Sequence, residues 1–439
     1  MNFRKYLRSI SETTASTFTS RIGLHLVYVG DAVAIGQYSS GELGWFGIAI
    51  AVSAVLFILG PGLMIGCLVN SSYARANQNY TAVGEYWRVG VFYGIIVGIV
   101  CGLICLAGSD VLRLFGQSDE VSDQAGGLLV WLGAAMPFHL AYIATLFVLE
   151  AVGKQRDAAI VFFLAAIVNA LLNLVLVPET AAGLAAEGAL MGTIVVRAGI
   201  LAALVTILLS SPSLRIYRFL PFRRPNPAVW REIVVFGLAG GISLVGETTA
   251  FASLTLFAGW MGGLQLTVYT ILFNILTLCF MMALAVGVAT NIAVSAARAE
   301  NDRRVVVSAL KAGLFLTLGI MCFGGAVSLV FATTFSSVFS ADEIAVLSAA
   351  GLMVWVSFMC VADGTQVTML YAVRAMGDKW IATGLHLVCY LGVMTGLAWL
   401  CGYYLEQGIA GLFLGGIVAS ILAVGLQWYR FRILLHRMA

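Results

Sequence analysis

The amino-acid sequence predicts an all-α integral membrane protein with twelve transmembrane helices in two pseudo-symmetric six-helix lobes. Composition is the first reason: hydrophobic residues make up 61% of the 439 residues and charged residues only 10%. Soluble domains are about 45–50% apolar and about 25% charged, so this chain belongs in a bilayer. An internal repeat and the one-sided placement of basic residues are the second and third reasons.

The chain repeats itself after 224 residues. Residues 151–154, Ala-Val-Gly-Lys, return as residues 375–378, Ala-Met-Gly-Asp. With a slip of one position, residues 73–77 return as residues 296–300. Such a repeat is far longer than a solenoid unit of about 20–50 residues. We interpret it as two fused half-proteins, an organisation typical of membrane transporters.

Twelve apolar segments are long enough to cross about 30 Å of hydrocarbon, which requires about 20 helical residues. Six lie in each half, so the halves have parallel topology. We predict an N-terminal lobe at 1–210, a cytoplasmic linker at 211–232 and a C-terminal lobe at 233–439. The predicted spans are 13–37, 44–69, 87–112, 125–149, 158–178, 184–210, 233–259, 264–294, 307–334, 345–373, 380–402 and 408–429.

Three of these elements carry further local signals. Gly60-Pro61-Gly62 predicts a break in the second span, because proline removes a helical hydrogen bond. Gly94, Gly98 and Gly102 recur every fourth residue in the third span, which predicts a face for close helix packing. The linker contains Pro212, Pro221, Pro225 and Pro227 and is rich in arginine, as expected for a solvated connector.

The basic residues predict the orientation. They precede the first span, follow the second, fourth, eighth and tenth spans, fill the linker and close the chain, so that 21 of the 24 Lys and Arg lie on one face. Loops enriched in Lys and Arg face the cytoplasm. We therefore expect a multi-pass protein of the inner (plasma) membrane with both termini cytoplasmic.

Three carboxylic acids lie well inside apolar spans: Asp31, Glu247 and Asp363. An acid costs about 2.5–3.5 kcal/mol at the centre of a membrane helix, which indicates a functional role. In low dielectric such a group either holds a proton or recruits a cation, the two ways in which an antiporter carries coupling ions. A buried ion pair or a protonated packing acid is the alternative for each. For Asp31 the candidate ion-pair partner is Arg21, close to His25.

Other polar residues in the spans predict either a substrate cavity or interhelical hydrogen bonds. The cavity candidates are Tyr28, Asn173, Thr193, Asn274 and Gln366, with Asn169 and Thr365 nearby. Arg197 is a plausible partner for an acid such as Glu187. His139 and His386 are each isolated on apolar helices, where packing is the more common role.

Several classes of function find no support in the sequence. The eight cysteines form no CxxC or Cys/His cluster, so we predict neither a metal site nor disulfides. P-loop, HExxH and G-x-S-x-G motifs are missing, so we expect no cofactor and no enzymatic activity, and transport must draw on an ion gradient. The expected partners are small organic substrates and membrane lipids, not nucleic acid, and we expect a monomer.

Taken together, these stretches resemble the multidrug and toxic compound extrusion (MATE) family, in its NorM-like branch. The stretches are Gly30-Asp31 with Gly36, Leu171-Leu172-Asn173, Gly188 to Thr193, Gly246-Glu247 with Gly262 and Asn274, and Asp363 to Val367 followed by Arg374 to Asp378. Val177 stands where several members have a second acid, and the motif around Arg75 is degenerate, which indicates a divergent member.

The resemblance implies a secondary-active antiporter that exports amphipathic, cationic small organic compounds as H⁺ or Na⁺ enters. It implies that Glu247 and Asp363 are the coupling acids of the second lobe and Asp31 that of the first, with Asn173 and Thr193 in the polar network of the first lobe. A central cavity between the lobes would open alternately to each side.

Protons are the favoured coupling ion. Sodium needs several hard oxygen ligands, and Met359 and Val367, one turn either side of Asp363, have no side-chain oxygen. The alternative function is a lipid-linked oligosaccharide flippase of the same superfamily. That function needs a cavity rich in basic residues, whereas only Arg21 and Arg197 are predicted mid-membrane.

Overall fold

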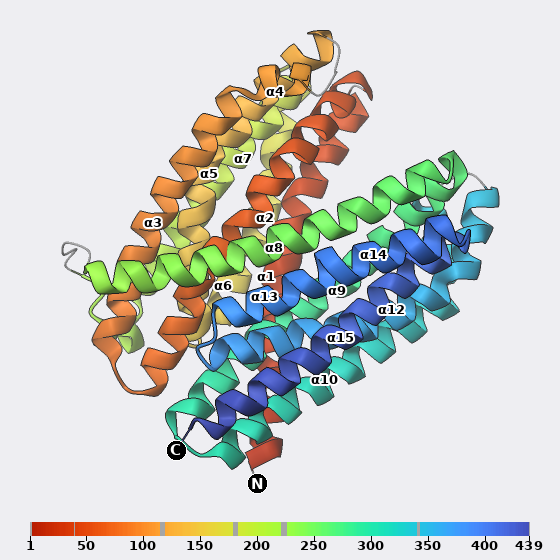
Figure 1. Ribbon diagram of the computed structural model, residues 1–439. Coiled ribbons are helices and arrows are strands. Elements are labelled where there is room, and N and C mark those ends of the chain that lie inside the picture. Colours follow the sequence, from red (N-terminus) through yellow and green to blue (C-terminus); the bar gives the residue numbers. More distant parts are fainter. Residues whose placement is uncertain are drawn as a thin grey trace. The chain divides into compact units, whose positions relative to one another are not determined.

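The computed structural model describes residues 2–38, 40–114, 119–178, 183–220, 226–339 and 343–438. Within these ranges every regular element is helical (Figure 1). This confirms the all-α class predicted from composition and span length.

The elements follow one another with short connections. The first half contains α1 (Asn2–Tyr38), α2 (Ser40–Ala76), α3 (Tyr80–Leu106), α4 (Gly108–Leu114), α5 (Asp119–Ala151), α6 (Gln155–Leu176), α7 (Ala185–Ser210) and the short helix η1 (Pro212–Tyr217). The second half contains α8 (Pro227–Trp260), α9 (Gly263–Ala299), α10 (Arg303–Val330), α11 (Ala332–Phe339), α12 (Glu343–Ala375), α13 (Trp380–Leu387), η2 (Val388–Met394), α14 (Thr395–Leu397), η3 (Ala398–Tyr404) and α15 (Gly408–His436).

Eleven helices in the described part of the chain are long and apolar enough to cross a membrane. In the first helix, α1, the stretch Leu26–Ile35 is apolar but shorter than these spans. The segments α13, η2, α14 and η3 together form one such span, Trp380–Tyr404. Its η2 and η3 parts have the wide π-helical turn.

The chain divides into two compact units, Thr19–Gly241 and a second that joins Met1–Phe18 to Ile242–Ala439. The start of α1 therefore packs with the second half of the sequence, and the start of α8 packs with the first half. These are units of packing. The predicted lobes, 1–210 and 233–439, concern sets of six spans and stay a prediction.

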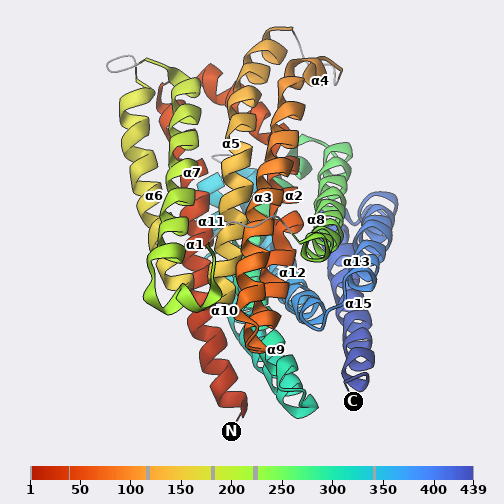
Figure 2. The ribbon, with the colours of Figure 1, turned by 90° about the vertical axis from the view of Figure 1, so that its left-hand side faces the viewer.

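Glycines allow close helix contacts in the unit Thr19–Gly241. A Cβ added at Gly98 of α3 would lie 2.4 Å from Pro137 Cα of α5, and one added at Gly94 would lie 2.9 Å from the Leu140 backbone. The two helices run side by side (Figure 2). The predicted packing face of the third span is thus confirmed.

The expected break at Gly60-Pro61-Gly62 is wrong, because α2 runs unbroken through Pro61. Its glycines are used for packing instead. A Cβ at Gly62 would lie 2.7 Å from the Gly241 Cα of α8, within the same unit. Small residues on both helices permit this approach.

In the second unit, α9, α10, α12 and α15 surround an extended apolar core. A further core joins Tyr6 and Ile10 at the start of α1 to α9, α10, α12 and α15. Tyr6 also donates a hydrogen bond to Glu300 Oε1 at 3.5 Å. Burial and this carboxylate raise the pKa of Tyr6 to about 12, so the phenol keeps its proton.

The sequence repeat recurs as one local structure in each unit. Arg75 Nη1 donates to the Ala151 carbonyl oxygen at 2.7 Å, and Arg298 Nη1 donates to that of Ala375 at 3.2 Å. Two residues after each alanine, Gly153 and Gly377 have φ values of 87° and 88°. L-residues with side chains rarely adopt this conformation, which explains why glycine occurs in both copies.

Candidate functional site

The first buried acid, Asp31, lies in the unit Thr19–Gly241 and is 1% exposed. Asn169 and Asn173, one turn apart on α6, donate from Nδ2 to Asp31 Oδ1 at 2.9 and 2.8 Å. Thr193 of α7 donates from its hydroxyl to Oδ2 at 2.6 Å. Three helices thus bring four polar side chains together, including the predicted Asn173 and Thr193.

This arrangement satisfies a buried carboxylate with neutral donors. Each donor is itself buried, so the cluster has little access to competing water. Asn173 Oδ1 has no hydrogen-bond partner among the described residues. A buried polar atom without a partner often marks a position for a water, an ion or a ligand group.

Arg197 and Tyr28 lie beside this cluster. Arg197 is 1% exposed, donates from Nη2 to the Tyr28 hydroxyl at 2.8 Å, and lies 4.5 Å from the centre of the Phe57 ring. Glu187, predicted as an example of an acidic partner for Arg197, is exposed in the first turn of α7, and Arg197 interacts electrostatically with Asp31 instead. The side chains of Arg21 and His25 lie outside the described residues.

The second unit contains the other two acids. Asp363 of α12 is 2% exposed and accepts a short hydrogen bond from the Tyr390 hydroxyl. That hydroxyl also lies 3.4 Å from Gln366 Oε1 and 3.2 Å from Ser420 Oγ of α15. Tyr390 belongs to η2, where the wide helical turn changes the direction of successive side chains. Such turns are frequent at functional sites.

Glu247 of α8 is 7% exposed and adjoins His386 of α13. The distance between Glu247 Oε2 and His386 Nε2 is 3.6 Å. His386 Nδ1 lies 2.5 Å from Ser243 Oγ, and the His386 and Tyr390 rings meet edge to face at 4.5 Å. Glu247 and Asp363 interact electrostatically, so the two acids belong to one network.

Arg374 was expected in the loop after the tenth span, which would leave the acids of the second lobe without a basic neighbour. In the structure it lies at the end of α12, is 5% exposed and interacts electrostatically with Glu247.

Of three further predicted residues, two donate hydrogen bonds within their own helices and one lies at the edge of these networks. Asn274 is exposed and donates to the Thr270 carbonyl of its own helix at 2.8 Å. Thr365 likewise donates to Val361. Gln366 adjoins Tyr390, and its Nε2 has no hydrogen-bond partner among the described residues.

Sequence reasoning did not assign Tyr390, Ser420 and Ser243 to the site and treated His386 chiefly as a packing residue. One signal could have found two of them. His386 and Tyr390 are four residues apart, so they share a face of one predicted span. In the first unit the pair Asn169 and Asn173 has the same spacing. His139 is buried, and its Nδ1 lies 2.7 Å from the Tyr142 hydroxyl.

Comparison with known proteins places this chain in a family. Residues 17–175 and 241–405 match the MatE family, and the two stretches begin 224 residues apart, the period of the internal repeat. The chain therefore belongs to the MatE family. A probable multidrug resistance protein NorM of Caulobacter vibrioides is 28% identical over 425 residues, which cover 94% of this chain and 89% of that protein. One of Agrobacterium fabrum is 24% identical and covers 95% and 91%.

Solved structures share the fold. The eukaryotic MATE transporter AtDTX14 superposes with a TM-score of 0.88 at 17% identity, over 100% of both chains. An outward-facing multidrug resistance MATE family transporter gives a TM-score of 0.89 at 17% identity, over 99% of this chain and 96% of that chain. A MOP superfamily transporter from Pyrococcus furiosus gives 0.89 at 16%, over 99% and 96%.

These findings confirm the predicted resemblance to NorM-like MATE transporters and the fold class of two helical lobes. This MatE protein is a multi-pass membrane protein of a multidrug efflux transporter family. The roles of its individual site residues stay predictions.

Proposed function

We propose that this MatE protein is a secondary-active antiporter that exports amphipathic, cationic organic compounds in exchange for entering protons, by alternating access. The observation that carries the proposal is the network of Glu247 and Asp363 with His386 and Tyr390 in one helical unit. When both are ionised, these two buried acids carry one negative charge more than their basic neighbour Arg374 balances, so a further cation is needed.

The exchange follows from this charge balance. When the organic cation is absent, a proton neutralises the acid pair. When the cation binds, it supplies the positive charge and the proton leaves. Binding of either cation removes the negative charge that attracts the other, so proton and substrate compete for the site. That competition couples their movements in opposite directions.

Protons fit the surroundings of these acids better than Na⁺. The groups that contact Asp31 are two amide nitrogens and a hydroxyl, all acting as donors, which favours the ionised carboxylate, so we assign the proton to the acids of the second unit. The closest contact of Asp363 is likewise a donating hydroxyl. A hard cation requires several oxygen atoms presented as acceptors, as for Ca²⁺ and Mg²⁺. A proton requires only one carboxyl oxygen.

The bacterial NorM relatives and the distribution of basic residues support a place in the plasma membrane with both termini in the cytoplasm. We further propose that the protein acts as a monomer and needs no cofactor. The flippase alternative is not favoured. Beside the Asp31 cluster, Arg197 is a single basic side chain, whereas a pyrophosphate needs a cavity with several.

Transport by purified protein in liposomes tests the proposal. Efflux of a fluorescent organic cation is followed first under a pH gradient without Na⁺, then under a Na⁺ gradient at equal pH. We expect efflux under the pH gradient and only background leak under the Na⁺ gradient. Efflux driven by the Na⁺ gradient alone would refute proton coupling, and background leak under both gradients would refute antiport of organic cations.

A further inference from the structure

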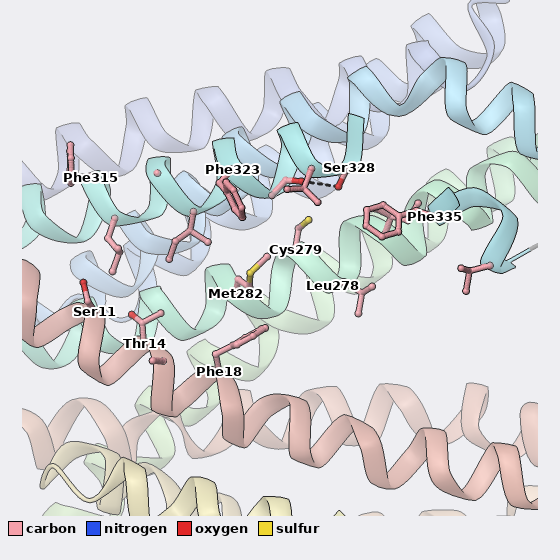
Figure 3. Close-up of a pocket in the computed structure, with 18 of the residues that line it drawn as sticks. Ser11, Thr14, Phe18, Leu278, Cys279, Met282, Phe315, Phe323, Ser328 and Phe335 are labelled. Atoms are coloured by element: carbon pink, nitrogen blue, oxygen red, sulfur yellow. Dashed lines mark hydrogen bonds between the residues drawn. The ribbon is translucent and has the colours of Figure 1, made fainter. Parts of the chain in front are cut away.

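An apolar groove of about 800 Å³ lies within the unit that joins Met1–Phe18 to Ile242–Ala439. Thr14 and Phe18 of α1 form one wall, and Met282 of α9 with Phe315 and Phe323 of α10 forms the other, closed at one end by Phe335 of α11 (Figure 3). Its volume is within the range of about 300–1,000 Å³ found for ligand pockets. The groove is separate from Glu247, Asp363 and their partners, none of which lines it.

Each of the helices α1 and α10 carries basic residues just before its groove-lining residues. On α10, Phe315, Gly319, Phe323 and Val327 follow one another every fourth residue, and Lys311 precedes them in the same register. On α1, Ser11, Ala15 and Phe18 share a face with Arg4 and Arg8. Side chains spaced in this way lie above one another on a helix.

The two helices contact one another close to these basic residues. The rings of Phe3 on α1 and Phe315 on α10 meet edge to face, with centres 6.0 Å apart. Arg4 directly follows Phe3, and Lys311 lies one helical turn before Phe315. Both basic residues are exposed. Arg8 is also exposed and pairs with Glu12 of the same helix at 3.0 Å. Exposed Arg4 and Lys311 therefore lie beyond one end of the groove, whose body is mainly apolar.

Its length matches one leaflet of a bilayer. From Lys311 to Phe323, α10 rises about 18 Å at 1.5 Å per residue. Half of the hydrocarbon core of a bilayer is about 15 Å thick. Phe323 is 72% exposed, so the groove is open along its side rather than enclosed. An apolar chain that enters from the lipid phase could lie along it with a charged end at Lys311.

We propose that this groove is a binding site for an anionic phospholipid. An acyl chain lies against Phe18, Met282 and Phe323, and the phosphate faces Lys311 and Arg4. Anionic headgroups are attracted to basic residues near the membrane surface, and lysine at a helix end extends its charge to that level. The inference goes beyond the proposed transport function and does not depend on it.

The start of α1 is anchored next to the groove by the protein itself. Tyr6 and Ile10 of α1 are buried in an apolar core with α9, α10, α12 and α15, and the groove residues Thr14 and Phe18 follow them on the same helix. A lipid in the groove would complete the packing of this segment of α1. It would thereby hold the segment against α9 and α10.

Photolabelling in liposomes tests the site. The protein is reconstituted into equal amounts of phosphatidylglycerol and phosphatidylcholine, with a diazirine acyl chain on one lipid at a time, and labelled peptides of α9 and α10 are quantified. We expect labelling by phosphatidylglycerol to exceed labelling by phosphatidylcholine about fivefold for each basic residue that contacts the headgroup. Lys311→Gln should lower this preference about fivefold, while Arg432→Gln, an exposed arginine on α15, should not.

A second pair of variants tests the groove itself. A Cβ at Gly319 meets no atom within 4 Å, so Gly319→Leu fills the groove without disturbing its walls. It should remove the labelling by both lipids. Gly351→Leu, on α12 and equally open, is the matched control and should leave labelling unchanged. Size-exclusion elution checks that each variant is folded.

Equal labelling by the two lipids in the parent protein would overturn the anionic preference. Labelling that persists in Gly319→Leu would overturn the groove as the site. If tetraphenylphosphonium displaced the label while unlabelled phosphatidylglycerol did not, the groove would bind organic cations instead, and the proposal would also be wrong.

Discussion

Asp363 and Glu247 belong to a single buried network of side chains, because Tyr390 and His386 join them. Substitutions that share one step are not additive, since the step can be lost only once. This property distinguishes one coupling site from two independent sites.

We therefore expect Glu247→Gln and Asp363→Asn each to reduce gradient-driven efflux in liposomes to the background leak. The double variant should be no worse than either single one. Glu343→Gln, an exposed acid at the start of α12, should retain the parent rate. Normal efflux by Asp363→Asn would exclude this acid from coupling.

Removing a hydrogen-bond donor from the Asp31 cluster should lower the stability of the folded protein. Thr193→Val removes the hydroxyl that donates to Asp31 Oδ2 at 2.6 Å. Hydrogen bonds to charged groups contribute about 1.5–3 kcal/mol, so thermal denaturation in detergent should show a loss of that order. On the same helix, Thr206 is exposed and donates to the Ala202 carbonyl. Thr206→Val should change stability by less than about 0.5 kcal/mol, and an equal loss in both would contradict the role assigned to Thr193.

The sequence predicted the acids of the site better than their partners. Asp31, Glu247 and Asp363 could be found because a charge in an apolar span has a high cost wherever the helix faces. Tyr390 and Ser420 are compatible with lipid-facing, packing or site positions alike, and only the rotation of each helix decides between these. Asn274 illustrates the opposite error, since its polarity is satisfied by its own helix.

At the scale of elements, the turns at Gly153 and Gly377, each next to an arginine, predict losses of stability of different size. A Cβ at Gly377 would lie 2.8 Å from Arg298 Nη1, and one at Gly153 would lie 3.2 Å from Arg75 Nη1. Displacing either guanidinium breaks its bond to the alanine carbonyl.

Gly377→Ala should therefore destabilise by about 1–3 kcal/mol, and Gly153→Ala by less. Gly351→Ala, in a helix with open space around it, should be neutral or stabilising by up to about 1 kcal/mol. Melting temperatures of the three variants in detergent provide the measurement. An unchanged melting temperature for Gly377→Ala would show that this turn tolerates a side chain.

Helix existence was predictable from apolar length, but details within helices were not. Proline at position 61 indicated a break, yet α2 continues through it as one helix, with closely packed glycines on both sides. The π turns in η2 and η3 have no signature in hydropathy. Both segments pack against α15, and such a neighbour is not encoded in a single-span pattern.

At the scale of the whole molecule, the orientation leads to a labelling experiment. Asp119 is exposed at the start of α5, and Arg215 is exposed in η1. Cysteine placed at position 119 should react with a membrane-impermeant maleimide in whole cells, and cysteine at 215 only after lysis. Replacing the exposed Cys322 by alanine provides the background. The reverse pattern would invert the topology.

The two-fold organisation was visible in the sequence because Gly153 and Gly377 keep the same turn in both halves. The division into compact units was not. Residues 1–12 precede the first predicted span, but Tyr6 and Ile10 among them pack with helices of the second half of the chain. Contacts over such sequence distances leave no periodic signal.

Proton release on substrate binding tests the central claim most directly. Purified protein in weakly buffered detergent solution is mixed with an organic cation, and the pH is followed with an indicator dye. We expect release of protons by the parent protein, and a much smaller release by Asp363→Asn at the same bound amount of cation. Binding of the cation by the parent protein without proton release would contradict proton–substrate exchange at these acids.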